Sequence, residues 1–200
     1  MCHRGRAGGA SGAAPLVQTL GARPPWPRSG RMAGVTDASQ GDVPPYPAEA
    51  ELPVRHAGRV IAVDPAGRVL LFRYDDPPPS GVHWATPGGG LEPGEDYYAG
   101  AVRELREETG WDDVAVGEAL PAVSGWRTIL QKEARRFFRQ YERFFLARVS
   151  VPQRPVRDVD GMHASDGIRA VHWWSLEELE ATQDVVYPIG LAGILRDLPS

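Results

Sequence analysis

The stretch that decides the fold runs over residues 88–111 and reads GGGLEPGEDYYAGAVRELREETGW. It begins as a glycine-rich loop, in which Gly88, Gly89, Gly90 and Gly94 let the backbone approach a ligand or adopt positive φ. A helix is predicted over Asp96–Thr109, with Glu95 at its start and Gly110 as a left-handed cap. Its apolar stripe has the i, i+3, i+4, i+7 spacing and consists of Tyr98, Ala101, Val102 and Leu105.

The end of this helix carries three acidic side chains, Glu104, Glu107 and Glu108. Their spacing predicts that they project from one face, opposite the apolar stripe. Carboxylates are unfavourable near a helix C-terminus, and Glu104 with Glu108 is a like-charge i, i+4 pair. Taken alone, the segment is typical of a solvated face. Next to a glycine-rich loop, however, clustered oxygen donors indicate a Mg²⁺ or Mn²⁺ site for a phosphorylated substrate.

The segment Gly89–Trp111 resembles the signature box of the Nudix hydrolase family. The residues in register with that pattern are Gly89, Glu95, Arg103, Glu104, Leu105, Glu107, Glu108 and Gly110. Trp111 stands where the family prefers an aliphatic residue, and we expect only a local packing adjustment there. The flanking stretches HWATPGG and VHWWSLEEL also look like this family.

The resemblance implies an α/β protein, a Nudix-type α/β/α sandwich with a mixed β-sheet. It implies a metal-dependent hydrolase that cleaves a diphosphate linkage, typically in a nucleoside diphosphate joined to another moiety. Mg²⁺ or Mn²⁺ would be the cofactor, held by Glu104, Glu107 and Glu108, with Glu108 foremost. Glu104 is the candidate general base, and Arg103 would support the catalytic set through a salt bridge to Glu95 or to a box glutamate.

Further candidates lie outside the box. Glu142 is the first choice for an additional metal-binding acid and Asp166 the second, although each is also explained as a surface acid. The residues proposed for substrate binding are Gly88, Gly89, Gly90 and Arg73. The aromatic residues that could stack on a base, or simply pack, are Trp84, Trp126 and Tyr141. The histidines that lack the paired spacing of a zinc site are His83, His163 and His172.

The distribution of charge and the number of cysteines argue against some kinds of partner and site. Residues 1–31 contain five arginines and no acid, which leaves 17 of the 22 basic residues against all 26 acidic ones in the remainder. This balance argues against long RNA or DNA as a partner and favours a small-molecule nucleotide or other diphosphate. Cys2, the single cysteine, excludes an intramolecular disulfide and favours the cytoplasm. No apolar run is long enough to span a membrane.

The chain is expected to have a disordered tail over residues 1–50 and one domain over residues 51–200. The tail is rich in Gly, Ala, Pro and Arg, and Met32 is an alternative start. A β-hairpin is predicted from Val60–Val63 and Val69–Phe72, which flank the turn at Asp64-Pro65-Ala66-Gly67. Further strands are expected at residues 82–87, 114–116, 124–130, 137–149 and 170–174. Short helices are expected at SLEELEAT, capped by Ser175, and at residues 188–196.

Two other functions are compatible with the same resemblance. An isopentenyl-diphosphate isomerase would be associated with a catalytic cysteine, whereas Cys2 lies in the tail. A non-catalytic nucleotide-binding regulatory module would usually have lost box acids, and all of them are present. The sequence does not distinguish among nucleoside triphosphates, dinucleoside polyphosphates and sugar nucleotides as the substrate. It also does not indicate whether the protein forms a homodimer.

Overall fold

The computed structural model describes residues 51–76, 80–131, 136–158 and 161–198 of the 200-residue chain. The strands in these ranges are β1 (Val54–Val63), β2 (Val69–Asp75), β3 (Val82–Ala85), β4 (Gly88–Gly90), β5 (Val116–Ala119), β6 (Gly125–Gln131), β7 (Arg136–Arg148), β8 (Ile168–Trp174) and β9 (Val185–Tyr187). The helices are α1 (Tyr97–Thr109), α2 (Met162–Ser165), α3 (Leu176–Ala181) and α4 (Leu191–Asp197).

The strands form one mixed sheet with the order β5-β7-β1-β2-β3-β9, and β4, β6 and β8 pair with β1, β7 and β2. The predicted hairpin of β1 and β2 is confirmed. Its turn is held by Asp64, whose carboxylate accepts hydrogen bonds from the backbone N–H groups of Ala66 and Arg68. The pairings of β1 with β7 and of β3 with β9 are parallel, whereas the other pairings are antiparallel.

The sheet splits between β1 and β2. These strands pair only next to their turn, through Val63 and Val69. The middle of β1, residues 57–59, pairs instead with the glycines of β4, so that Gly58 lies opposite Gly89. The glycine-rich segment therefore lies at the opening of the sheet, and its place there positions the site described below.

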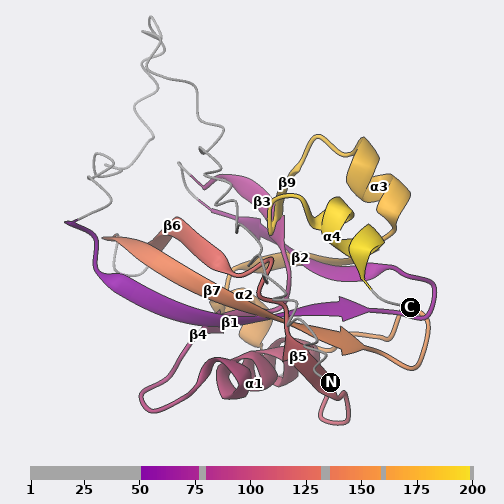
Figure 1. Cartoon of the computed structure of the whole chain (residues 1–200), viewed down its shortest axis with the longest axis horizontal. Coiled ribbons are helices and arrows are strands. Elements are labelled where there is room, and N and C mark those ends of the chain that lie inside the picture. Colours follow the sequence, from indigo (N-terminus) through magenta and orange to yellow (C-terminus); the bar gives the residue numbers. More distant parts are fainter. Residues whose placement is uncertain (1–50, 77–79, 132–135, 159–160, 199–200) are drawn as a thin grey trace, which may run out of the picture. The chain divides into compact units, whose positions relative to one another are not determined.

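Helices cover both faces of the sheet, as Figure 1 shows with α1 on one side and α3 and α4 on the other. One hydrophobic cluster joins α1, through Ala101 and Leu105, to alternate residues of β1 and β7 such as Val60 and Phe145. The second cluster lies under α4, where Leu191 packs with Ile61 of β1. Alternation along each strand thus fills two cores, and the predicted α/β/α sandwich with a mixed sheet is confirmed.

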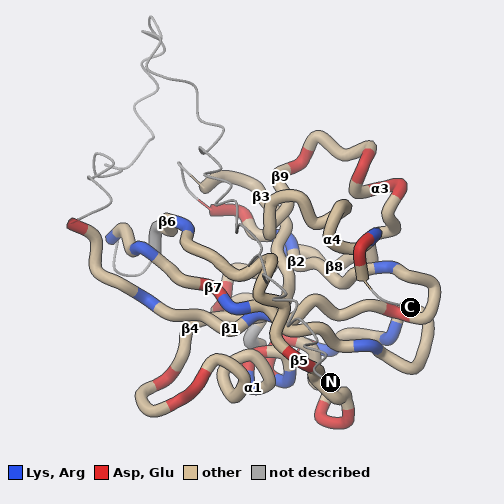
Figure 2. Tube along the Cα trace, viewed as in Figure 1, with Lys and Arg blue, Asp and Glu red and all other residues tan. Residues whose placement is uncertain are grey.

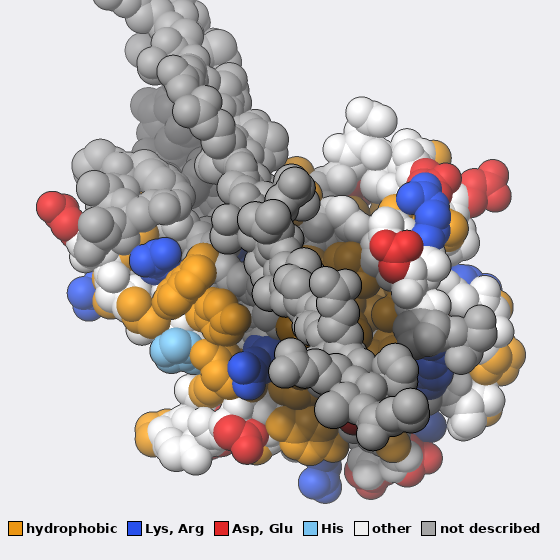
Figure 3. All heavy atoms as spheres, viewed as in Figure 1, with side chains coloured by type: hydrophobic (Ala, Val, Ile, Leu, Met, Phe, Trp, Pro, Cys, Tyr) orange, Lys and Arg blue, Asp and Glu red, His pale blue; other side chains and the backbone are white. Residues whose placement is uncertain are grey.

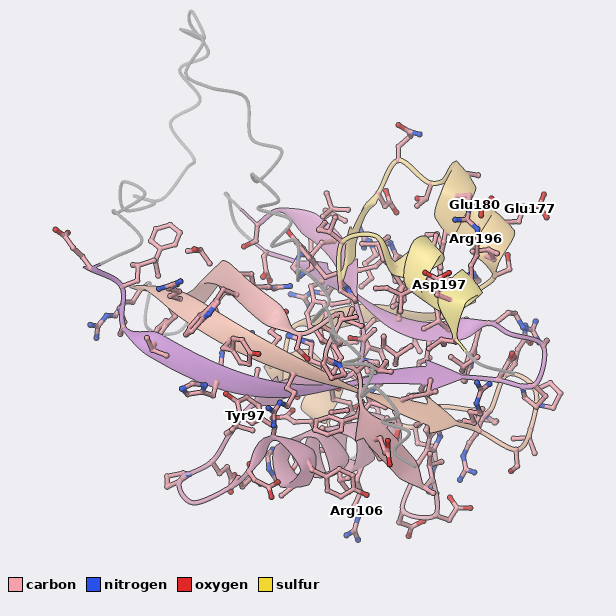
Figure 4. The ribbon with its side chains drawn as sticks, viewed as in Figure 1. Tyr97, Arg106, Glu177, Glu180, Arg196 and Asp197 are labelled. Carbon is pink, nitrogen blue, oxygen red and sulfur yellow. The ribbon has the colours of Figure 1, made fainter. Side chains whose placement is uncertain are left out.

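The two C-terminal helices are joined by a side-chain hydrogen bond, and the first of them, α3, begins with a side-chain cap. Ser175 caps α3, as the sequence predicts, and the structure adds a capping box with Glu178. Arg196 of α4 donates a hydrogen bond to Glu180 of α3, and both side chains are labelled in Figure 4. No helix in the described ranges is long and apolar enough to cross a membrane.

The buried face of helix α1 differs in part from the one that the sequence predicted. Asp96, not Glu95, caps it by accepting a hydrogen bond from the N–H of Ala99, and Gly110 ends it with φ 70°. Tyr98 is 46% exposed, although it was assigned to the apolar stripe. Glu108 is 2% exposed and shares the buried side of the helix with Leu105. The glutamates therefore do not all lie opposite the stripe, because Glu108 packs into the opening of the sheet.

Three short elements were not predicted: β4, β9 and α2. The expectations about the tail of residues 1–50 and about Met32 concern residues outside the described ranges.

Candidate active site

A pocket of about 450 Å³ opens at the split in the sheet. Its walls come from segments far apart in the sequence. One wall carries basic and amide groups of β1, β6 and β7, namely Arg55, Arg59, Arg127 and Gln140. The other lining residues include the three glycines of β4 and the side chains Tyr74, Asp76, His83, Glu104, Glu108 and Asp166. In Figure 2, basic segments lie along β1, β6 and β7, whereas acidic segments lie on α1 and on the loop before it.

Glu108 is the most deeply buried acid of the pocket. One of its carboxylate oxygens accepts a hydrogen bond of 2.7 Å from the backbone N–H of Gly88, and the other accepts one of 3.3 Å from the hydroxyl of Tyr74. Burial raises the pKa of Glu108 well above its usual value, and the nearby carboxylate of Glu104 raises it further. The pocket thus holds two carboxylates that disfavour each other's ionisation.

Glu104 lies against the glycine-rich strand. A Cβ atom placed on Gly89 would be only 2.5 Å from Oε1 of Glu104, so a side chain at this position would displace the carboxylate. Burial raises the pKa of Glu104 above its usual value, and Arg103 opposes this shift. Gly89 therefore leaves the space that the carboxylate of Glu104 occupies, whereas Gly88 and Gly94 are the glycines of this segment with positive φ.

Arg103 connects the acids of the box. It donates to both oxygens of Glu95, at 2.8 and 3.1 Å, and to Glu104 and Glu107 at 3.0 and 2.9 Å. It also donates to the carbonyl of Gly90. The side chain of Glu107 is 37% exposed and does not line the pocket. Arg103 thus holds the loop before α1 against the helix, and in this arrangement it engages Glu107 on the outer side.

Glu142 is buried beneath the pocket wall. It accepts hydrogen bonds of 2.6 Å from Nε of Arg59 and of 2.8 Å from Nε2 of Gln140. Although burial raises the pKa of Glu142, Arg127 and Arg59 lower it below its usual value. Arg59 also donates to the carbonyls of Thr86 and Gly88 and so connects β1 to the glycine-rich segment. The surface-acid explanation of Glu142 is wrong, since the residue is 4% exposed.

The pocket brings together only part of the predicted set. Gly88, Gly89, Gly90, Glu104, Glu108, Asp166 and His83 line it. Arg73, Trp84, Trp126 and Tyr141 do not line it. Trp84 donates to Asp184, and Trp126 contacts Tyr141 with ring centroids 5.1 Å apart. His163 contacts the carbonyl of Glu108 through its ring nitrogen, at 2.6 Å.

Arg59, Tyr74, Arg127 and Gln140 are pocket residues that the sequence did not single out. A signal existed for Arg59, because it stands next to the apolar run Val60–Val63 and arginines are almost never buried without a partner. The other three could be found only with the register of the strands. Arg127 and Gln140 are opposite each other in the pairing of β6 with β7.

Comparison with known proteins shows which family the chain belongs to. The family model described as the NUDIX domain matches residues 53–190, which is more than half of the chain. The chain belongs to the Nudix family. The box of this Nudix protein is the loop and helix that supply Glu104 and Glu108 to the pocket.

Individual relatives align over shorter ranges. The RNA pyrophosphohydrolase of Dinoroseobacter shibae is 48% identical over 80 residues, which are 38% of this chain and 46% of that protein. The asymmetrical bis(5′-nucleosyl)-tetraphosphatase of Caenorhabditis elegans is 42% identical over 57 residues, or 28% of this chain and 39% of that protein. The chain thus spans less than half the length of these two curated relatives.

A solved structure supports the fold. The crystal structure of the MutT protein from Methanosarcina mazei Go1 is similar with a TM-score of 0.51 and 20% identity, over 73% of this chain and 93% of that chain. The Nudix fold thus extends well beyond the box.

The pocket offers some, but not all, of the oxygen ligands that a divalent cation needs from a protein. Glu104 and Glu108 offer oxygen ligands on one side of the pocket, and their mutual repulsion is what a cation would relieve. Among the residues that the structure describes, however, no three His, Cys, Asp or Glu side chains are grouped closely enough to share a metal ion. A third protein ligand would require a side chain such as Asp166 or Glu107 to turn toward this pair.

Proposed function

We propose that this chain is a Nudix hydrolase that cleaves the diphosphate linkage of a nucleotide with the help of Mg²⁺ or Mn²⁺. The observation that carries the proposal is the pair Glu104 and Glu108, a partly buried and a buried carboxylate with raised pKa values beside the glycines of β4. A raised pKa at the entrance of a cleft is a mark of a functional site. The names of the two curated relatives, a pyrophosphohydrolase and a tetraphosphatase, agree with this reaction class.

The roles of the residues follow from their contacts. Glu104 and Glu108 would hold the cation, which would withdraw charge from the phosphate oxygens and acidify a water molecule. Asp166, an exposed residue that lines the pocket and whose charge raises the pKa of Glu108, is the acid from outside the box that we favour as a further ligand. Glu142 is instead proposed to keep Arg59 ionised and in place, since its carboxylate is already bound by Arg59 and Gln140.

The protein contributes positioning and charge to the reaction. The guanidinium groups of Arg55, Arg59 and Arg127 face the pocket and would attract the phosphates. Glu104 remains the candidate general base, and Arg103 orients it through the 3.0 Å hydrogen bond. A water oxygen would attack phosphorus, its proton would pass to Glu104, and the bond to the bridging oxygen would break in line.

A panel of nucleotides tests this proposal. It should contain nucleoside triphosphates, dinucleoside polyphosphates, sugar nucleotides and a short RNA with a 5′-triphosphate, each with Mg²⁺ and with Mn²⁺. Phosphate released directly, or after a coupling phosphatase, is the readout. We expect turnover of at least one member that is lost with a chelator. Silence across the panel, together with nucleotide binding, would favour the regulatory-module function.

A further inference from the structure

The segment between β7 and β8 is bonded to the C-terminal end of α1. The last carbonyl groups of a helix have no partner within the helix and need one from elsewhere. The backbone N–H of Arg157 donates to the carbonyl of Thr109, and its Nη2 donates to the carbonyl of Gly110, each at 3.1 Å. The ring Nε2 of His163 lies 2.6 Å from the carbonyl oxygen of Glu108. Three consecutive carbonyls at this end of α1 thus take their partners from one distant segment.

Trp111, the residue that departs from the box pattern, adds a second attachment. Its Nε1 donates to the carbonyl of Pro155 at 2.8 Å, a contact that an aliphatic side chain could not make. Its ring stacks on Trp173 of β8 with centroids 6.0 Å apart, and the guanidinium of Arg154 lies 5.3 Å from the ring centroid. The tryptophan therefore holds the start of the same segment against the end of the box.

His163, on α2, connects this segment to both the sheet and α1. A carbonyl oxygen only accepts hydrogen bonds, so Nε2 of His163 carries the proton and donates to Glu108. The ring packs against Phe72 of β2, with centroids 5.7 Å apart. Its backbone N–H donates to the carboxylate of Asp158 at 3.0 Å. The half-buried imidazole is thus held between the sheet and the end of α1.

The position of α2 decides where Asp166 lies. Asp166 follows α2 directly, three residues after His163, and lines the pocket. Burial is the main cause of the raised pKa of Glu108, and the charge of Asp166 adds to it, so the two carboxylates lie near each other. Asp166 itself is exposed and has no place in either hydrophobic cluster. Its distance from Glu108 therefore depends on how firmly α2 is attached to α1.

We propose that His163 is a positioning residue, which holds Asp166 beside Glu108 by its hydrogen bond to the end of α1. This inference rests on the proposed function, because it assumes that these two acids share a divalent cation. Without the imidazole, the carbonyl of Glu108 would be left to water and α2 could move away from α1. The affinity for the cation would then fall, although both carboxylates would still be present.

Binding of Mn²⁺ alone tests the proposal without any hydrolysis. Electron paramagnetic resonance of free Mn²⁺ gives the dissociation constant for the full chain without substrate. His163→Ala should raise this constant about tenfold or more, as replacing a residue that orients a metal ligand typically does. His163→Gln keeps an N–H donor at a similar reach and should stay within about threefold of the wild type. Thermal unfolding without metal shows whether each variant is folded.

His56→Ala is the matched control. His56 makes the counterpart contact at the other end of α1, with Nδ1 at 2.6 Å from the hydroxyl of Tyr97 and ring centroids 5.7 Å apart. It is exposed beside Trp126 of β6 and does not line the pocket. Figure 3 shows hydrophobic side chains beside a histidine on the visible face, near the end of the sheet where β6 lies. The control should leave the dissociation constant of Mn²⁺ unchanged.

A double-mutant cycle separates action through Asp166 from a general loosening of α1. Asp166→Asn should weaken Mn²⁺ binding about tenfold or more by itself. Adding His163→Ala to Asp166→Asn should change the constant by less than about threefold, because the residue being positioned has already lost its charge. If the two effects multiplied instead, His163 would act independently of Asp166 and the proposal would be overturned.

Three further outcomes would also overturn the proposal: no Mn²⁺ binding by the wild-type chain at millimolar concentration, an unchanged constant in folded His163→Ala, or equal weakening by His163→Ala and His163→Gln. The two proposals fail separately. Hydrolysis of the panel together with any of these outcomes would refute only the role of His163. Binding of Mn²⁺ that depends on His163 and Asp166, without hydrolysis of any nucleotide, would refute only the enzymatic function.

Discussion

Glu108 lies on the buried face of α1, near its C-terminal end. Its carboxylate accepts hydrogen bonds from the backbone N–H of Gly88 and the hydroxyl of Tyr74. Burial is the main reason for its raised pKa, and the repulsion from Glu104 is the second. Glu104 also has a raised pKa, chiefly from burial. The folded chain without metal therefore binds protons more tightly at these two sites than the unfolded chain does.

The first prediction concerns the pH dependence of stability. Because the unfolded carboxyls lose their protons near pH 4.3, earlier than the folded ones, the free energy of unfolding should fall as pH rises above this value. Thermal unfolding in a chelator should show this fall between pH 5 and pH 8. The double variant Glu104→Gln/Glu108→Gln should have a flatter profile. Equal slopes for the two proteins would contradict the raised pKa values.

A second prediction separates two roles for Glu142. Glu142→Gln removes the charge that faces the buried Arg59, whose side chain is 11% exposed, so the free energy of unfolding should fall by about 3–5 kcal/mol. Urea denaturation measures this loss. Under conditions where the variant is folded, kcat should stay within about tenfold of wild type, as for a positioning residue. A much larger loss of kcat with unchanged stability would make Glu142 a metal ligand.

Single residues also show what the sequence could reveal about the site. Glu104 and Glu108 were found because the box is contiguous and its spacing is specific. Arg127 and Gln140 were not, because they become neighbours only when β6 pairs with β7, and that register is absent from any local pattern. Arg73, a candidate for phosphate binding because it is basic and near a strand end, does not line the pocket, which contains Arg55, Arg59 and Arg127.

At the level of secondary structure elements, the packing of α1 against β1 depends on Gly58. A Cβ atom at this position would lie 2.3 Å from the carbonyl oxygen of Tyr97 and 2.7 Å from the backbone nitrogen of Ala101. Tyr97 is labelled in Figure 4 at the start of α1, close to β1. The helix backbone therefore rests directly on the strand, and any side chain on Gly58 would push α1 and its glutamates away.

The third prediction follows from this contact. Gly58→Ala should lower the free energy of unfolding by about 1–3 kcal/mol or more, since overpacking against backbone cannot be relieved by a rotamer change. It should also reduce kcat, because Glu104 and Glu108 move with α1. Gly125→Ala on β6 is the control, as nothing lies within 4 Å of its added Cβ. Equal stability of the two variants would refute the close approach.

Local patterns predicted the longer elements and missed the short ones. The hairpin, α1 and β7 have apolar periodicity over several residues, and turn or cap residues mark the hairpin turn and the ends of α1. The strand β4 consists of three glycines, which carry no hydrophobic pattern, and it exists because β1 offers it free backbone partners. Tyr98 fits the helical spacing of the stripe but remains exposed, since periodicity says nothing about where the sheet ends.

At the scale of the whole molecule, the charges that line the pocket indicate the kind of substrate better than the net charge of the chain does. The chain has a formal net charge of −4, yet three arginines line its pocket together with the acids. Such a cleft suits a polyphosphate bound together with a cation, whatever the overall sign. The 5′-triphosphate RNA in the substrate panel therefore tests whether the acidic surface excludes a longer chain.

The fourth prediction tests the central claim, that Glu108 in this pocket supports a metal-dependent hydrolysis. On the best substrate of the panel with Mg²⁺, Glu108→Gln should lower kcat at least about 100-fold, because charge stabilisation by a bound cation is worth several kcal/mol. Its melting temperature without metal should equal or exceed that of the wild type, since a neutral amide relieves the burial of a charge. Turnover by the folded variant within tenfold of the wild-type kcat would contradict the account.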